Sequence, residues 1–164
     1  MRQILEDILK MPYYRNYQAI SGACHNISKH EDAVKDIFVS HGLSEVVRKV
    51  PRATRDDWLS DPTSCDMENG TFVFQPCGKN DSPDFIVKLN GRAYFIECKS
   101  VKGASKAPMY NSGIPKSGYI YVFTAERYNE TTIYFGKDVC PPQDYDKFQK
   151  LIEDHRKLDE QLNK

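Results

Sequence analysis

The stretch SPDFIVKLNGRAYFIECKS, residues 82–100, decides the fold expected of this 164-residue chain. Asn90-Gly91 is the strongest short-range signal for a two-residue hairpin loop, and the segments on both sides are rich in β-branched and aromatic residues. With these two residues as the loop, Asp84 faces Glu97 across the strand pair. The sequence therefore predicts a β-hairpin that brings two carboxylates to one side of a sheet.

This pair of like charges needs compensation, because like charges directly opposite each other destabilise a sheet, with Cβ atoms roughly 5 Å apart. Lys99 lies two residues after Glu97 and should point to the same side. A divalent cation would neutralise the carboxylates, and oxygen ligands suit Mg²⁺, which keeps waters and binds substrate phosphates. A lysine beside such an ion can activate water or stabilise transition-state charge. The alternative is a charged strand end, where Lys99 only pairs with Glu97.

The motif PD, then twelve residues, then ECK, at positions 83–99, resembles the signature of the PD-(D/E)XK nuclease superfamily. Within that superfamily the chain is most similar to the type II restriction endonucleases, over residues 26–136. The resemblance implies Mg²⁺-dependent, sequence-specific hydrolysis of phosphodiester bonds in double-stranded DNA. It also implies that Asp84 and Glu97 are metal ligands and that Lys99 is the catalytic lysine.

Hydrophobic spacing and turn residues predict an α/β fold with a mixed central β-sheet flanked by helices, which is the restriction-endonuclease-like core. Three helices are expected, at residues 2–10, 28–41 and 143–162. In the second of them, Ser28 is the expected N-cap and Gly42 ends the helix. Strands are expected at 71–75, 84–89, 93–98, 118–124 and 131–135. The chain is predicted to be one nuclease domain, 1–164, with its core at 26–136 and its C-terminal helix at 143–162.

Two connecting segments carry separate expectations. Residues 48–70 are polar and rich in turn residues, which indicates a long surface segment. The superfamily core normally joins its third and fourth strands by a crossover helix, but residues 101–117 contain Pro108 and Pro115 and show no helical stripe. A parallel crossover needs about a dozen residues, so the length suffices and any helix there must be short.

Glu31 is a further candidate for the catalytic site. It precedes Val34 and Phe38 by three and seven residues, so it should lie on the inward stripe of the second helix. Superfamily nucleases often have a glutamate on their first core helix that approaches the metal, so the resemblance implies a catalytic role. The alternative is a capping box, Ser28-x-x-Glu31, in which Glu31 accepts a hydrogen bond from the Ser28 amide.

Two loops supply candidate contacts to DNA. The loop before Pro83 contains a glycine and should open near the carboxylates, and the segment 109–118 is polar, small and aromatic. Polar side chains can bond base edges or phosphates, and lysine can neutralise a phosphate. The alternative for both loops is an ordinary surface turn. The candidate DNA-binding residues are Gln75, Lys79, Asn80, Lys102, Asn111, Ser112 and Lys116.

The composition limits the class of protein. The 23 basic and 23 acidic residues give zero net charge, which argues against a non-specific DNA coat but permits a local basic face. The five cysteines are widely spaced without a Cys-x-x-Cys pair, so neither a zinc site nor a disulfide framework is indicated. Without a signal peptide or a long apolar run, a reducing cytoplasm is the expected compartment, with no membrane partner.

These features predict a Mg²⁺-dependent, sequence-specific endonuclease for double-stranded DNA, of the type II restriction type. One alternative is a Holliday-junction resolvase or DNA-repair nuclease of the same superfamily, and another is a non-catalytic DNA-binding module. Because one active site cuts one strand, a two-fold homodimer is expected to make the double-strand break. The alternative is a cleavage subunit that acts with a larger recognition subunit.

Overall fold

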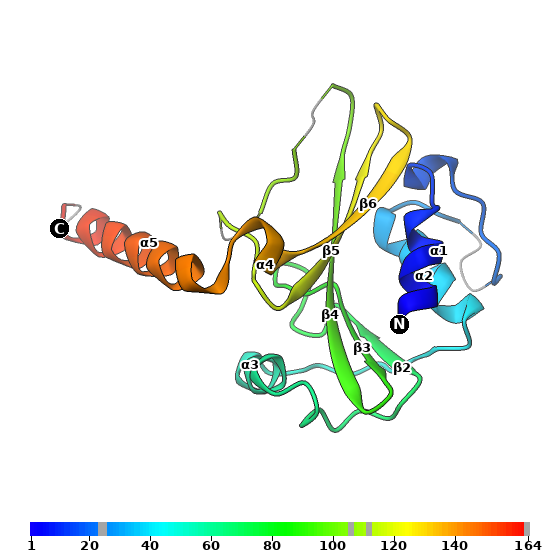
Figure 1. Ribbon diagram of the computed structural model, residues 1–164, viewed down its shortest axis with the longest axis horizontal. Coiled ribbons are helices and arrows are strands. Elements are labelled where there is room, and N and C mark those ends of the chain that lie inside the picture. Colours follow the sequence, from blue (N-terminus) through cyan, green and yellow to red (C-terminus); the bar gives the residue numbers. More distant parts are fainter. Residues whose placement is uncertain (23–25, 105–106, 111–112, 163–164) are drawn as a thin grey trace.

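The computed structural model describes residues 1–22, 26–104, 107–110 and 113–162, and a six-stranded β-sheet forms its centre (Figure 1). The helical segments are α1 (Arg2–Leu9), η1 (Tyr14–Asn16), α2 (His30–Ser40), α3 (Arg52–Ser60), α4 (Gly136–Val139) and α5 (Pro142–Leu162). The strands are β1 (Ser44–Glu45), β2 (Thr71–Phe74), β3 (Phe85–Leu89), β4 (Arg92–Val101), β5 (Tyr119–Ala125) and β6 (Glu130–Phe135). Helices lie on both faces of the sheet, which confirms the predicted α/β class.

The sheet is mixed, and its strands lie side by side in the order in which they occur along the chain. β2, β3 and β4 form successive antiparallel pairs, β4 and β5 are parallel, and β5 and β6 are antiparallel. β1 pairs in parallel with β2 and was not predicted, because two residues carry no alternating pattern. In the connection from β4 to β5, the described residues (102–104, 107–110 and 113–118) include no helix.

The hairpin between β3 and β4 has the predicted register. Its pairs run from Leu89 opposite Arg92 to Phe85 opposite Ile96. Both residues of the two-residue loop have positive φ angles, 49° and 74°, as a hairpin loop of this length requires. Asp84 is the next residue beyond the last pair, so the ladder ends where the candidate site begins.

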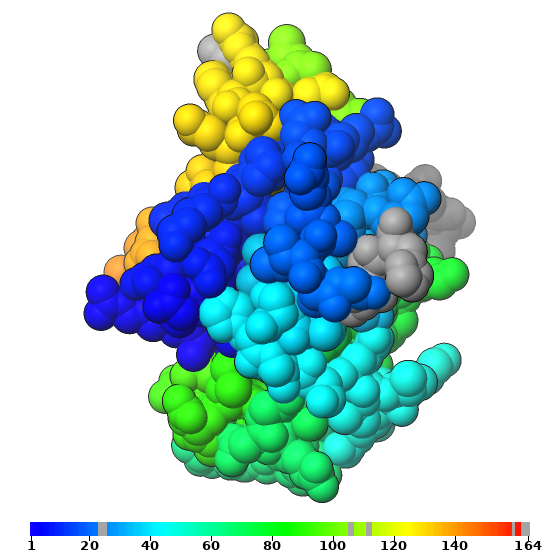
Figure 2. Space-filling model, turned by 90° about the vertical axis from the view of Figure 1, so that its right-hand side faces the viewer, coloured from blue at the N-terminus to red at the C-terminus, as the bar shows by residue number. Residues whose placement is uncertain are grey.

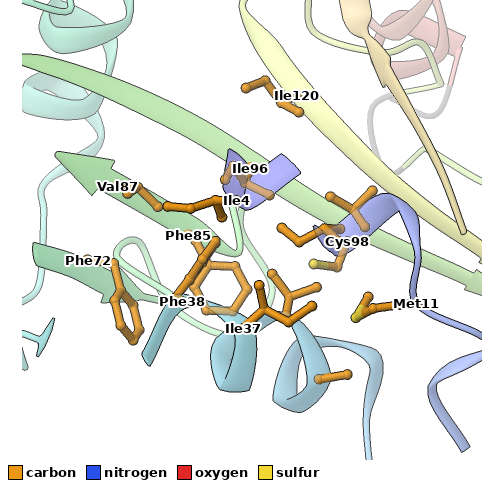
Figure 3. Close-up of a cluster of buried hydrophobic side chains, with 14 of the residues drawn as sticks. Ile4, Met11, Ile37, Phe38, Phe72, Phe85, Val87, Ile96, Cys98 and Ile120 are labelled. Atoms are coloured by element: carbon orange, nitrogen blue, oxygen red, sulfur yellow. The ribbon is translucent and has the colours of Figure 1, made fainter. Parts of the chain in front are cut away.

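Strand alternation separates two buried clusters, one on each face of the sheet. Figure 3 shows side chains from α1, α2 and the sheet pointing toward one another in the first cluster, which includes Ile4, Met11, Ile37, Phe38, Phe72, Phe85, Val87, Ile96 and Cys98. The second cluster lies on the face covered by α3 and includes Trp58, Val73, Ile86, Ala93, Phe95, Tyr119 and Tyr121. Because Phe95 lies in the second cluster, alternation along β4 directs Glu97 and Lys99 to that face as well.

The first two helices form close to their predicted positions. The N-terminal segment, in blue, spreads over the face that α2 covers (Figure 2). α2 buries Val34 and Phe38 completely, as its apolar spacing predicted. The prediction that Ser28 is the N-cap is wrong: α2 begins at His30, and Lys29 occupies the cap position.

Residues 48–70, expected as a long surface segment, contain the helix α3, which was not predicted. Trp58 and Arg55 are both buried, at 4% and 6% exposure. The Arg55 guanidinium donates hydrogen bonds to Asp81 (3.3 Å) and to the Ser82 carbonyl (2.8 Å). α3 therefore packs against the sheet through Trp58 and through the ion pair of Arg55 with Asp81. Neither contact requires a run of apolar residues at helical spacing, so the helix was not predicted.

The predicted C-terminal helix forms as α5 and projects from the rest of the molecule (Figure 1). Four large apolar side chains on it are 44–64% exposed, namely Phe148, Leu151, Ile152 and Leu158. Among the described residues, no helix has both the length and the apolar character needed to cross a membrane.

Asp36 of α2 holds the segment that follows η1. Its carboxylate accepts hydrogen bonds from the Tyr17 hydroxyl (2.6 Å), the Ile20 amide (2.8 Å) and the Ser21 amide (3.1 Å). Burial alone would raise the pKa of Asp36, but these hydrogen bonds outweigh it and lower the pKa. Asp36 therefore ties residues 17–21 to the helix that borders the candidate site.

We expect Asp36→Ala to lower the free energy of unfolding by about 2–4 kcal/mol, because it leaves several donors without an acceptor. Urea denaturation at neutral pH measures the change. Asp66→Ala is the matched control, since Asp66 is exposed and pairs with Arg48 at the surface, and it should cost less than about 1 kcal/mol. Equal losses in the two variants would contradict the assignment.

Candidate active site

Asp84 is held by the strands on both sides of it. Its backbone carbonyl accepts a hydrogen bond from the Gln75 amide (2.7 Å), and its Oδ2 accepts one from the Cys98 amide (2.7 Å). Gln75 directly follows β2, and Cys98 lies in β4 between Glu97 and Lys99. The Asp84 side chain is thereby fixed against the strand that carries the other two motif residues, and the structure brings all three together.

Glu97 is a buried carboxylate with only one of its oxygens bonded. Its side chain is 7% exposed, and Oε1 accepts a hydrogen bond from Lys99 Nζ at 2.8 Å. Oε2 is buried and has no hydrogen-bond partner among the described residues. A buried carboxylate oxygen without a partner is costly, so this atom is a place where a cation or a donor would stabilise the protein.

The pKa of Asp84 is raised to about 7, first by burial and then by the charge of Glu97. Glu31 adds to the rise, whereas the Cys98 amide and the Lys99 ammonium oppose it. Without a cation, the protein therefore holds Asp84 partly protonated at neutral pH. A positive ion placed between Asp84 and Glu97 would reverse this effect and favour both ionised forms.

Glu31 lies in the first turn of α2, close enough to Asp84 for its charge to raise the Asp84 pKa. The capping-box alternative for Glu31 is wrong, because Asp32 takes that role. Asp32 Oδ2 accepts hydrogen bonds from the Ser28 amide (3.0 Å) and from the Lys29 amide (2.9 Å). The helix start is thus capped one residue later than expected, and Glu31 is a third carboxylate near the pair.

His30 connects the start of α2 to β4. It is 3% exposed, and its ring stacks near that of Tyr14, with centroids 6.2 Å apart. Burial lowers its pKa to about 4, against a smaller opposing effect of the Lys99 backbone, so the imidazole is neutral at physiological pH. This neutral, buried ring lies near the Lys99 backbone, at the start of the helix that carries Glu31.

A pocket of about 230 Å³ opens on the sheet face that carries Glu97 and Lys99. Tyr121 lies beside Glu97 in the parallel pairing of β4 with β5, and it forms part of the wall. Tyr121 was not predicted as a site residue. Parallel pairing of β4 with β5 would have indicated that a β5 side chain lies beside Glu97. The pocket is lined by Asn80, Asp81, Ser82, Glu97, Lys99, Tyr110, Lys116 and Tyr121.

The candidate DNA-binding residues divide among several places. Asn80 and Lys116 line the pocket beside Glu97. Gln75 and Lys79 line a separate hollow of about 570 Å³ near β1, and Lys102 is exposed just after β4. The two remaining candidates lie outside the described residues, and they are Asn111 and Ser112.

The residues at this site fit Mg²⁺ better than a metal held by protein ligands alone. Among the described residues, no group of three or more His, Cys, Asp or Glu side chains has the geometry to hold a metal ion. Mg²⁺ characteristically binds through one or two carboxylates, and waters and substrate phosphates complete its coordination. The unpartnered Glu97 Oε2 and the destabilised charge on Asp84 are the two features such an ion would satisfy.

Comparison with protein-family models, with curated proteins and with solved structures gives no match to this chain.

We expect Asp84→Asn to stabilise the metal-free protein near pH 8. Asp84 has its ordinary pKa of 3.8 in the unfolded chain and a pKa of about 7 when folded. The folded state therefore binds the extra proton, and stability is lost as the pH rises from about 4 through about 7. The variant lacks this loss, so its free energy of unfolding should exceed that of wild type by roughly 4 kcal/mol near pH 8 and by much less near pH 4.

Urea denaturation in the presence of a chelator measures this difference. Replacing the chelator by millimolar Mg²⁺ should stabilise the wild type and leave Asp84→Asn unchanged. Asp66→Asn controls for a general effect of removing one negative charge, since Asp66 is exposed. A variant that is less stable than wild type at both pH values would show that Asp84 is a structural acceptor only.

Proposed function

We propose that this protein is a Mg²⁺-dependent endonuclease that hydrolyses double-stranded DNA at specific sequences, of the type II restriction type. The observation that carries the proposal is the unpartnered, buried Glu97 Oε2 beside Asp84, whose pKa is raised to about 7. Lys99 contacts Glu97 at the wall of the same pocket. A carboxyl group with a raised pKa, next to a buried carboxylate oxygen without a partner and an ammonium group on a pocket wall, is typical of a catalytic site.

Asp84 and Glu97 would hold the metal ion through their carboxylate oxygens. When bound, Mg²⁺ would supply charge neutralisation at the phosphate and a lowered pKa for a coordinated water. Lys99, fixed by its hydrogen bond to Glu97 Oε1, would orient the attacking water and stabilise the negative charge that develops on the phosphate oxygens. Glu31 would act on the Asp84 side of the site, through its charge.

The proposed reaction is in-line attack of water on phosphorus. A bond forms between the water oxygen and phosphorus, and the bond from phosphorus to the 3′ oxygen breaks. One water proton leaves to solvent, and the 3′ oxygen gains a proton to become a hydroxyl. The products are a 5′-phosphate end and a 3′-hydroxyl end.

DNA contacts in this proposal come from residues around the pocket and from its neighbouring loops. Asn80 and Lys116 are already on the pocket wall, where they would meet the strand that is cut. The remaining contacts would reach flanking phosphates or base edges, and they are Gln75, Lys79, Lys102, Asn111 and Ser112.

The free thiols of the four described cysteines support the proposed reducing, cytoplasmic setting.

A second copy of this chain is part of the proposal, because one site cuts only one strand. α5 supports it, since Phe148, Leu151 and Leu158 recur on the helix at intervals of three and seven residues and are 47–64% exposed. This spacing is that of a helix seam that packs against an identical helix. A homodimer joined through α5 would present two active sites with the two-fold symmetry of a palindromic target.

We expect Asp84→Asn and Glu97→Gln to abolish cleavage of plasmid DNA in Mg²⁺, while binding of duplex DNA is retained. Lys99→Ala should lower the cleavage rate by about 10²-fold or more, as expected when a charge-stabilising or proton-transfer group is removed. Gel analysis of a sequenced plasmid measures the rates.

Discrete fragments from the wild type support a sequence-specific enzyme. Cutting of branched or damaged DNA alone would favour the resolvase or repair nuclease, and cleavage by Asp84→Asn at the wild-type rate would refute the site.

We expect light scattering to give twice the mass of the chain for the wild type and the single mass for Leu151→Glu, because a charge in an apolar helix seam is not solvated. Val47→Glu is the control, since Val47 is 98% exposed elsewhere on the surface, and it should remain dimeric. A wild-type monomer that cuts nothing alone would instead favour a separate recognition subunit.

A further inference from the structure

Lys116 is a second ammonium group in the pocket that contains Glu97 and Lys99. Its Nζ donates hydrogen bonds to Ser82 Oγ (2.9 Å) and to the Tyr119 hydroxyl (3.5 Å), and it lies 5.1 Å from the centre of the Tyr119 ring. These are neutral groups. No carboxylate of the described residues forms an ion pair with Lys116, although the side chain is partly buried.

The carboxylates closest to this side of the pocket already have cationic partners. Asp81 pairs with Arg52 and with Arg55 (3.3 Å), and Glu97 pairs with Lys99 (2.8 Å). Lys116 is therefore the cation of this group that lacks a negative partner. Within the part of the chain that the structure describes, the pocket carries a positive charge that protein carboxylates leave unpaired.

This unpaired cation is held in an unfavourable environment. Burial lowers the pKa of Lys116 and the nearby Arg55 guanidinium lowers it further, whereas the charges of Asp81, Asp56 and Glu97 oppose the shift without cancelling it. Arg55 itself is buried, so solvent screens its charge poorly. Two neutral hydroxyl partners do not offset the loss of hydration of an ammonium group, and an anion in the pocket would.

The backbone of Lys116 is fixed, unlike that of an ordinary surface lysine. Its amide donates a hydrogen bond to the Tyr121 hydroxyl (2.7 Å), and its carbonyl accepts one from the Tyr119 amide (3.1 Å). Gly136 packs so closely that a Cβ there would lie 1.8 Å from the Lys116 carbonyl oxygen. Tyr121 in turn stacks on Tyr134, with ring centroids 5.3 Å apart.

We propose that Lys116 and Ser82 form a phosphate-binding site in this pocket, separate from the carboxylate pair. The ammonium and the hydroxyl donate to non-bridging oxygens of one phosphate group, and Lys99 borders the same space. In the nuclease proposed above, on which this identification of the ligand rests, the phosphate belongs to the DNA strand that enters beside Glu97. The same chemistry would accept free phosphate, so the test separates the two sources.

The first experiment measures thermal stability in rising concentrations of inorganic phosphate, with a chelator present and with chloride at matched ionic strength as the reference. Phosphate should raise the melting temperature of the wild type. Lys116→Met keeps the length of the side chain without its charge, and its response should fall to less than about a third. Lys137→Met is the control, because Lys137 is exposed and lies outside the pocket, and it should respond like wild type. A wild-type response no larger than that to chloride, or an equal response in Lys116→Met, would overturn the proposal.

The second experiment measures binding of a duplex oligonucleotide at several salt concentrations, again without divalent metal. Lys116→Met should weaken binding to all sequences and reduce the slope of log affinity against log salt by about one. If phosphate binding depends on Lys116 but duplex binding does not, the pocket takes free phosphate rather than DNA; if the wild type also cleaves no DNA, the nuclease proposal fails while the phosphate site stands. If Lys116→Met cleaves and binds phosphate as wild type does, the phosphate site fails and the nuclease proposal stands.

Discussion

The candidate site depends on one electrostatic constraint, the presence of two neighbouring carboxylates, Asp84 and Glu97, on a largely apolar sheet. The Cys98 amide fixes Asp84, and Lys99 bonds one oxygen of Glu97. Both carboxylates are therefore immobile and cannot move apart into solvent to relieve their repulsion. Burial and the charge of Glu97 raise the pKa of Asp84, so ionising Asp84 destabilises the folded state, and a sequence selected for stability alone would not retain this arrangement.

Local features of the sequence were sufficient to predict this constraint. The Asn90-Gly91 loop fixes the register of the hairpin, and the two-residue period of a strand then decides which side chains share a face. The side of Glu97 and Lys99 follows from these two facts without knowledge of any other contact. The five strands with alternating or continuous apolar runs and the three amphipathic helices were predictable for the same reason, since each pattern lies within one element.

Features that depend on contacts distant in sequence could not be predicted in this way. α3 buries a charged residue, Arg55, on its inner side, so its sequence shows no apolar stripe. The partners of Arg55 are Asp81 and the Ser82 carbonyl, which lie more than twenty residues away in the sequence. At the start of α2, Asp32 rather than Glu31 accepts the hydrogen bonds of the backbone amides. Glu31 and Asp32 are adjacent acidic residues, so the sequence alone does not show which of them caps the helix. Lys116 was a candidate for DNA contact by residue type alone, and only the fold brings it beside Glu97.

The two halves of the pocket have complementary needs. Glu97 makes one side of the pocket negative, with Asp84 and Glu31 near it, whereas Lys116 makes the other side positive, with Arg55 near it. A divalent cation alone would satisfy the carboxylates and add repulsion toward Lys116, and a phosphate alone would satisfy Lys116 and add repulsion toward the carboxylates. Each proposed ligand would therefore bind more tightly when the other is present, and by thermodynamic reciprocity the increase in affinity must be the same for both. A site of this kind favours the metal and the substrate phosphate together over either one by itself, which is the condition that metal-dependent phosphoryl transfer requires.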